Sequence, residues 1–256
     1  MFLDGDELAY DYTKYYKLYE LFEIDVKEVL VIGGGAYSTP KALVAQLPEA
    51  NIDVVEIEPS LYELSKRYFK LKDSPRLKNY IADGRQFLHD TDKRYDLIFA
   101  DAYFSIYSIP AHLTTVEFFK LAKERLSENG IFIANIIGDF SRTKPSLLLS
   151  EIKTFREVFS ESYFFAVDSV SKSDPQNIIF LGIKGGHNAN YKDSIIRILN
   201  DKLIDLNRFE LTPYPILTDN FAPVEYLVSG IIKRVSKTQD IKSGVTKVDG
   251  EEMLAI

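Results

Sequence analysis

Short apolar runs alternate with segments of helical periodicity along most of the chain. The run Val29–Ile32 is apolar at every position and ends at three glycines, as a strand buried on both faces of a parallel sheet does. Similar runs predict strands at 52–57, 77–82, 95–100 and 131–137. Helical patterns lie between them, and Pro40 and Pro59 stand where a first helical turn accepts proline. Five such units predict an α/β protein with a doubly wound parallel sheet.

The pattern changes near the end of the predicted sheet. After a helix expected at 147–159, two strand-like runs, 162–167 and 177–183, follow each other with no helix between them. A dinucleotide-binding dehydrogenase would continue with strand, helix and strand. The sequence therefore predicts a mostly parallel, seven-stranded sheet of the class I methyltransferase type, closed by an antiparallel hairpin.

The remaining segments give the expected domain organisation. A small N-terminal extension, 1–24, is expected to lie over the active site, and residues 25–228 form the catalytic domain. We expect Asn129 and Gly130 to cap a helix around 118–126, and a last helix to cover 191–206. The residues from 229 to 256 are polar and weakly patterned, which predicts a frayed tail.

Composition narrows the classes of function. The net charge of −7 disfavours a nucleic-acid partner, and the absence of cysteine excludes disulfides and thiol chemistry. The three histidines lack metal-ligand spacing, so no metal is expected. There is no long apolar run and no signal-peptide layout, which predicts a cytoplasmic chain without a membrane segment, although it can be one part of a longer protein.

Candidate chemistry lies at the ends of four predicted strands, where open α/β sheets bind ligands. The glycines Gly33, Gly34 and Gly35 suit a close approach of the backbone to a ligand, or a plain tight turn. Glu56 is placed to accept hydrogen bonds from ribose hydroxyls, or is a solvated strand-end carboxylate. Ser38 stands where the dinucleotide fingerprint needs its third glycine.

The third and fourth strands also end in acidic residues. Asp83, followed by Gly84, is either a nucleobase-binding residue or the N-cap of a helix. Asp101 is placed beside a reactive centre or forms a turn. The four positions together predict a nucleoside site at one edge of the sheet.

The stretch 29–138 resembles the spermidine synthase (polyamine aminopropyltransferase) family. The resemblance rests on Val-Leu-Val-Ile-Gly-Gly-Gly, Val-Val-Glu-Ile-Glu-Pro, Ala-Asp-Gly-Arg-Gln-Phe-Leu and Tyr-Asp-Leu-Ile-Phe-Ala-Asp-Ala-Tyr. Weaker similarity runs from Leu3-Asp4-Gly5 to Leu217-Thr218-Asp219, and the segment 109–115 is similar to a bacterial and archaeal subgroup, some of whose members are fused to membrane segments.

The resemblance implies a transferase that binds S-adenosylmethionine or its decarboxylated form and moves an alkyl group to an amine. It assigns the ribose to Glu56, the adenine end to Asp83 and the role of base to Asp101. Tyr15, Tyr103, Phe104 and Tyr107 are expected in the substrate pocket, and family members commonly form homodimers.

Two positions depart from the family pattern. Ala36 replaces the aspartate that holds the aminopropyl ammonium, and Phe104 replaces the aspartate that binds the far amine of putrescine. Burying an ammonium without a partner costs several kcal/mol. Three interpretations therefore stay open: an aminopropyltransferase-like enzyme, an S-adenosylmethionine-dependent methyltransferase of unknown acceptor, and a non-catalytic nucleoside sensor.

Overall fold

The computed structural model describes residues 8–22, 24–102, 108–140, 145–172, 174–185 and 190–242. The strands are β1 (Glu28–Ile32), β2 (Asn51–Glu56), β3 (Leu77–Ile81), β4 (Tyr95–Ala100), β5 (Leu126–Gly138), β6 (Glu161–Ala166) and β7 (Gln176–Ile183). The α-helices are α1 (Ser38–Gln46), α2 (Leu61–Tyr68), α3 (Gly84–Asp90), α4 (Val116–Glu124), α5 (Leu147–Val158), α6 (Asn190–Leu199) and α7 (Val224–Lys242). The 3₁₀ helices are η1 (Asp11–Phe22), η2 (Ala111–Leu113) and η3 (Leu206–Arg208).

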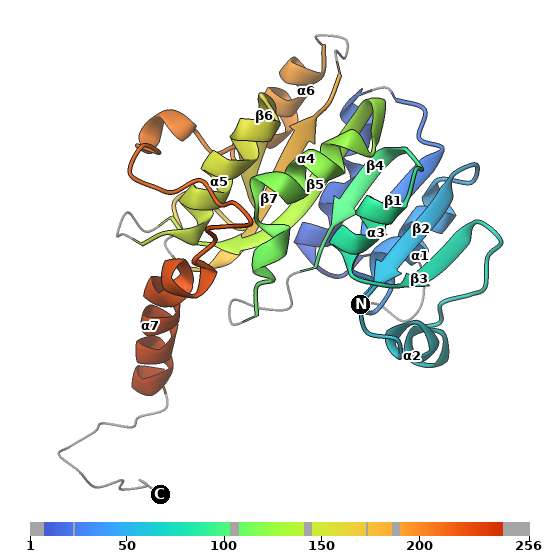
Figure 1. Cartoon of the computed structure of the whole chain (residues 1–256), viewed down its shortest axis with the longest axis horizontal. Coiled ribbons are helices and arrows are strands. Elements are labelled where there is room, and N and C mark those ends of the chain that lie inside the picture. Colours follow the sequence, from blue (N-terminus) through green and yellow to red (C-terminus); the bar gives the residue numbers. More distant parts are fainter. Residues whose placement is uncertain are drawn as a thin grey trace, which may run out of the picture.

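The seven strands form one sheet in the order β3-β2-β1-β4-β5-β7-β6 (Figure 1). The pairs β3–β2, β2–β1, β1–β4 and β4–β5 are parallel, and β7 pairs antiparallel with both β5 and β6. This confirms the predicted class I methyltransferase arrangement. The strand order reverses between β1 and β4, and ligands bind at such a switch point in doubly wound sheets.

Successive side chains of the strands point to opposite faces of the sheet and pack into two hydrophobic layers, one on each face. In β1, Leu30 and Ile32 belong to the layer covered by α3, α4 and α5, whereas Val29 and Val31 face the layer of η1, α1 and α6. All four are at most 2% exposed. A strand covered on both faces must be apolar throughout, which explains the continuous apolar runs in the sequence.

Two predicted boundaries are wrong for local reasons. Asn129 and Gly130 do not cap a helix, because α4 ends at Glu124 and both residues lie inside β5. They belong to an irregularity in the pairing of β4 with β5, and a Cβ at Gly130 would lie 2.8 Å from the Tyr95 carbonyl oxygen. The last predicted helix ends at Leu199 rather than 206, because the backbone of 202–204 bonds the free edge of β6.

The predicted frayed tail is also wrong over part of its length, because α7 extends from Val224 to Lys242. Its Leu227, Val228 and Ile231 are at most 5% exposed and form a small cluster with Leu147 and Leu217. Helical spacing of these apolar residues places them on one face. The helix extends from the body of the molecule toward the C-terminus (Figure 1).

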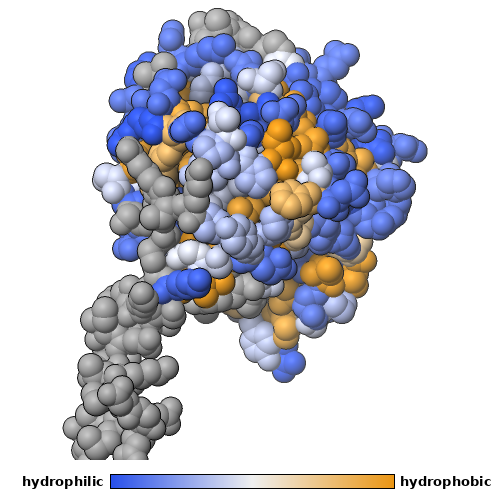
Figure 2. Space-filling model, turned by 60° about the vertical axis from the view of Figure 1, so that its left-hand side comes forward, coloured by the Kyte–Doolittle hydropathy of each residue, from blue (hydrophilic) through white to orange (hydrophobic). Residues whose placement is uncertain are grey.

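The surface is mostly polar on the face shown in Figure 2, where hydrophobic side chains gather in separate patches among hydrophilic ones. Scattered apolar exposure of this kind is ordinary for globular proteins. Within the described ranges, no helix combines the length and apolarity needed to cross a membrane.

A buried carboxylate ties together the amino-terminal parts of the central strands. Asp53 in β2 is 1% exposed, and it accepts hydrogen bonds from Lys93 Nζ at 2.8 Å and the Tyr95 hydroxyl at 2.9 Å. Lys93 also pairs with Glu28 of β1 at 2.6 Å. A buried carboxylate depends on such partners, since water cannot replace them.

We expect Lys93→Met to lower the free energy of unfolding by about 2–3 kcal/mol, because it removes the cationic partner of the buried Asp53. The loss is not larger because Lys93 itself is partly exposed to water. Urea denaturation measures the change. Lys66→Met is the matched control, since Lys66 has similar exposure but pairs with the exposed Asp73, and it should cost at most about 1 kcal/mol. Equal losses in the two variants would show that the burial of Asp53 does not determine the cost.

Candidate active site

A cavity of about 840 Å³ lies at the carboxyl ends of the parallel strands, a size that suits a small-molecule ligand. Six of the predicted site residues line it together: Gly33, Gly35, Glu56, Asp83, Gly84 and Asp101. Ala36 and Tyr12 also line it. Residues far apart in the sequence therefore meet at one sheet edge, as parallel strands require.

The remaining predicted residues lie elsewhere. Gly34 is beside the cavity but is not part of its lining, and Tyr15 packs against Phe165, with ring centroids 6.1 Å apart. Tyr103, Phe104 and Tyr107 fall outside the residues that the structure describes. The substrate-pocket assignment of these four aromatic residues stays a prediction.

The loop after β1, residues 33–35, is called the glycine loop, and it consists of glycines because its backbone lies in contact with neighbouring residues. Gly33 has a φ of +93°, and a Cβ there would lie 2.2 Å from the Asp101 carbonyl oxygen. A Cβ at Gly34 would lie 2.6 Å from the ring of Tyr37. Any side chain at these two positions would therefore push the loop away from β4 or from α1.

Glu56 holds this loop in place. Its Oε2 accepts hydrogen bonds from the amides of Gly34 and Gly35 at 2.8 and 3.0 Å, and its Oε1 accepts one from the amide of Glu58 at 2.9 Å. A carboxylate has about four acceptor positions, so roughly one remains for a ligand. Glu56 is thus a structural part of the loop as well as the predicted ribose-binding residue.

Asp83 is the N-cap of α3, the alternative role considered from the sequence. Its Oδ1 accepts from the amides of Arg85 and Gln86, and its Oδ2 lies 2.8 Å from His112 Nε2. Burial opposes ionisation of Asp83, but the hydrogen bonds from Gln86 and His112 outweigh it and hold its pKa below the ordinary value. The carboxylate is therefore ionised and largely occupied by protein donors.

Asp101 follows the last residue of β4 and lies in an environment that opposes its ionisation. Asn135 Nδ2 donates to its Oδ1 at 2.9 Å, and the Tyr12 hydroxyl donates to the same carboxyl group. Burial raises the pKa of Asp101, and these two hydrogen bonds offset the effect only in part. A carboxylate with a raised pKa has increased affinity for a proton, which is a property of a general base.

The donors to Asp101 are functional residues that the sequence reasoning missed. The side-chain Oδ1 of Asn135 accepts a hydrogen bond from Asn177 Nδ2 at 2.9 Å, which turns the Asn135 Nδ2 toward Asp101. A sequence signal existed for Asn135, since it is the one polar residue in the run 131–137. Tyr12 gave no such signal, because its contact depends on how η1 packs on the sheet.

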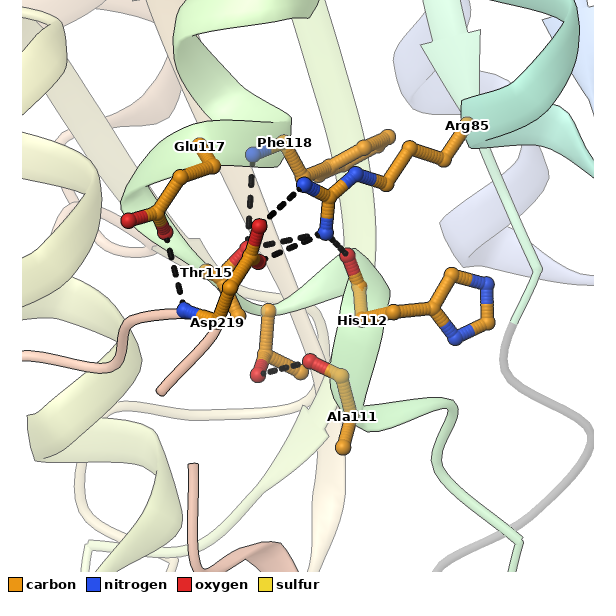
Figure 3. Close-up of polar contacts among 8 residues, drawn as sticks. Arg85, Ala111, His112, Thr115, Glu117, Phe118 and Asp219 are labelled. Carbon is orange, nitrogen blue, oxygen red and sulfur yellow. Dashed lines mark hydrogen bonds and ion pairs between the residues drawn. The ribbon is translucent and has the colours of Figure 1, made fainter. Parts of the chain in front are cut away.

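A second polar cluster, formed by Arg85, Thr115 and Asp219, lies behind His112 and supports the cavity wall without lining the cavity (Figure 3). Asp219 receives both terminal nitrogens of Arg85, at 2.7 and 2.5 Å, and the hydroxyl of Thr115 at 2.9 Å. Arg85 Nη1 also donates to the backbone carbonyl of His112 at 3.1 Å. The segments 109–115 and 217–219, separate in the sequence, are thereby joined.

The described residues contain no group of three or more potential ligands that could hold a metal ion. The cavity's acidic side chains are engaged by backbone amides, an imidazole and neutral donors instead.

The sequence matches a known protein family. The sequence model of the spermine/spermidine synthase domain matches residues 18–192. A polyamine aminopropyltransferase of Vibrio vulnificus (strain CMCP6) is 36% identical over 154 residues, which are 59% of this chain and 50% of that protein. The chain spans about half the length of this and similar curated relatives.

Solved structures share the fold. A probable spermidine synthase from Corynebacterium glutamicum superposes with a TM-score of 0.69 and 22% identity, covering 85% of this chain and 83% of that one. Human methyltransferase-like protein 13 in complex with SAH gives a TM-score of 0.55 and 24% identity, covering 68% and 82%.

The raised pKa of Asp101 predicts a pH-dependent stability difference. The native state keeps the Asp101 proton to higher pH than the unfolded state, whose aspartate pKa is about 3.9. The resulting stabilisation is present below that value and is lost as the pH rises through the native pKa. Asp101→Asn should therefore gain stability relative to the wild type as the pH rises above about 4, measured by urea unfolding between pH 4 and 8.

Asp90→Asn is the control with the opposite sign. Hydrogen bonds from Gln86 and His89 lower the pKa of Asp90, so this variant should lose stability relative to the wild type as the pH rises from acid. A constant difference between Asp101→Asn and the wild type across the range would contradict the raised pKa.

Proposed function

We propose that this chain, which belongs to the spermine/spermidine synthase family, is a transferase that moves an alkyl group from an S-adenosylmethionine-type sulfonium to an amine, with Asp101 as the base. One observation carries the proposal. A partly buried carboxylate, Asp101, faces the same cavity as Glu56 and the glycine loop and is held by two neutral donors. That arrangement brings a proton acceptor to the place where the donor's reactive carbon would lie.

The reaction needs such an acceptor because an ammonium has no lone pair with which to attack. Asp101 takes a proton from the ammonium, the amine nitrogen forms a bond to the sulfonium-bound carbon, and the carbon–sulfur bond breaks to leave a neutral thioether. The raised pKa of Asp101 makes this proton transfer less unfavourable. Tyr12 and Asn135 fix the carboxyl group in one orientation, which favours attack along a single line.

The donor's nucleoside would lie along the glycine loop. Gly33 and Gly35 present backbone there, and Glu56 keeps about one acceptor position for a ribose hydroxyl. The amides of Gly34 and Gly35 are already bound to Glu56, so this loop offers shape more than free donors. The ribose role of Glu56 is therefore shared with its role in supporting the loop.

Ala36 favours methyl transfer from the intact donor as a second candidate. It lines the cavity with a methyl group where the family pattern has an aspartate for the aminopropyl ammonium. Without that carboxylate, the decarboxylated donor loses an ionic partner. A purely sensing role fits less well, because a partly buried acid at position 101 costs stability and serves a binder little.

Calorimetric titration with S-adenosylmethionine, its decarboxylated form and methylthioadenosine tests the proposal. We expect at least one sulfonium donor to bind, and Asp101→Asn to retain affinity within about threefold while losing transfer by about a hundredfold or more. Transfer is measured as release of the thioether product with a panel of amines. Binding of none of the three ligands, or full turnover by Asp101→Asn, would contradict the proposal.

The variant Ala36→Asp separates the two candidates. It restores a carboxylate at the cavity wall, so the ratio of affinities should shift toward the decarboxylated donor by about tenfold. Ala36→Asn, similar in size but uncharged, is the control and should leave the ratio nearly unchanged. No shift with the aspartate would mean that residue 36 does not face the donor's amine.

A further inference from the structure

The segment 109–115 has no role in the proposed transfer step, yet it forms part of the cavity wall. Pro110, His112 and Leu113 line the cavity beside Ala82 and Asp83. His112 binds Asp83, which lies just after β3, and its backbone carbonyl accepts a hydrogen bond from Arg85 of α3, whereas Asp101 follows β4. This wall is therefore the part of the site to which the nucleobase of a donor would be directed.

Asp83 has little capacity left to bind that nucleobase directly. A carboxylate accepts about four hydrogen bonds, and three of these positions are taken by the amides of Arg85 and Gln86 and by His112 Nε2. Two side-chain polar groups remain on this wall, the Ser108 hydroxyl and the second ring nitrogen of His112, and of these the imidazole is the one that Asp83 orients. The His112 side chain is 47% exposed, and no other described residue binds the ring.

We propose that His112, oriented by Asp83, is the residue that recognises the nucleobase edge and selects a 6-aminopurine over a 6-oxopurine. The inference rests on the proposed function, since it takes a nucleoside donor to occupy the cavity. It changes the role of Asp83 from a direct ligand of the base to a residue that positions an imidazole.

The chemistry follows from the tautomer. Asp83 is ionised and acts only as an acceptor, so the Nε2 of His112 that faces it carries the hydrogen. In the neutral ring, Nδ1 then has a lone pair and accepts a hydrogen bond from an exocyclic amino group. A 6-oxo group presents lone pairs to this nitrogen instead, which leaves both acceptors without a donor.

The backbone of His112 is held by a cluster that includes Asp219, far along the chain. Arg85, fixed by both oxygens of Asp219, donates to the His112 carbonyl, and Thr115 also binds Asp219. In Figure 3 the imidazole points away from the Arg85–Asp219 pair. The backbone of residue 112 is thereby anchored while its side chain is directed to the opposite side, toward Asp83 and the cavity.

Calorimetric titration of the full chain with methylthioadenosine and its 6-oxo counterpart, methylthioinosine, tests the inference. We expect the wild type to favour the amino compound by about ten- to a hundredfold, and His112→Phe, which keeps a ring but lacks nitrogen, to bind the two within about threefold. His112→Ala serves as a second variant should the phenyl ring obstruct the cavity. His89→Phe, on the exposed last turn of α3, is the matched control and should retain the wild-type preference.

The outcomes separate this inference from the proposed function. Retained discrimination in both His112 variants would overturn the inference and assign base recognition to Asp83, while leaving the transferase proposal intact. Loss of discrimination in both variants, with methylthioadenosine still bound, supports it. Failure of the wild type to bind either nucleoside would contradict the proposed function and the inference together.

Discussion

The site depends on a backbone contact between the loop after β1 and the residue after β4. The Asp101 carbonyl lies where a Cβ of residue 33 would be, so the two strands that flank the switch point meet without a side chain between them. This contact keeps the glycine loop and the Asp101 carboxyl group at a fixed separation. Glu56 strengthens the arrangement by binding the next two amides of the same loop.

Three of the four acidic residues that line the cavity, Glu56, Asp83 and Asp101, show how position determines chemical behaviour. Glu56 and Asp83 accept hydrogen bonds mainly from backbone amides. Those to Glu56 stabilise the glycine loop, and those to Asp83 stabilise the N-terminus of α3. Among the described residues, the donors to Asp101 are side chains, and burial raises its pKa. Of the three, it is therefore the one suited to taking up and releasing a proton.

The sheet and the cavity's main residues were predictable from the sequence because both follow from local patterns. Continuous apolar runs require strands covered on both faces, and the glycines and acids that end them converge once the strands are parallel. Boundaries and partners were less predictable. The sequence around Gly130 predicts a helix cap, and only the structure shows how closely Gly130 approaches the Tyr95 carbonyl. The residues at the end of α7 are polar, so the sequence did not indicate that apolar residues in its first half pack against Leu147 and Leu217.

The residues that were missed have their partners far away in the chain. Tyr12 reaches Asp101 only through the packing of η1, and no periodicity encodes that contact. The pairing of Asp83 with His112 likewise depends on the turn at η2. Asn135 is the exception, since a polar residue within an apolar strand is visible in the sequence itself and must find a partner when buried.

The ion pair between Arg85 and Asp219 joins residues 134 positions apart. All seven strands have been synthesised by residue 183, but the carboxylate that fixes Arg85 comes 36 residues later. A nascent chain thus contains the residues of all seven strands before it contains the carboxylate that completes the wall at His112. During biosynthesis, the wall at His112 is therefore completed only once residue 219 is available, later than the residues of all seven strands.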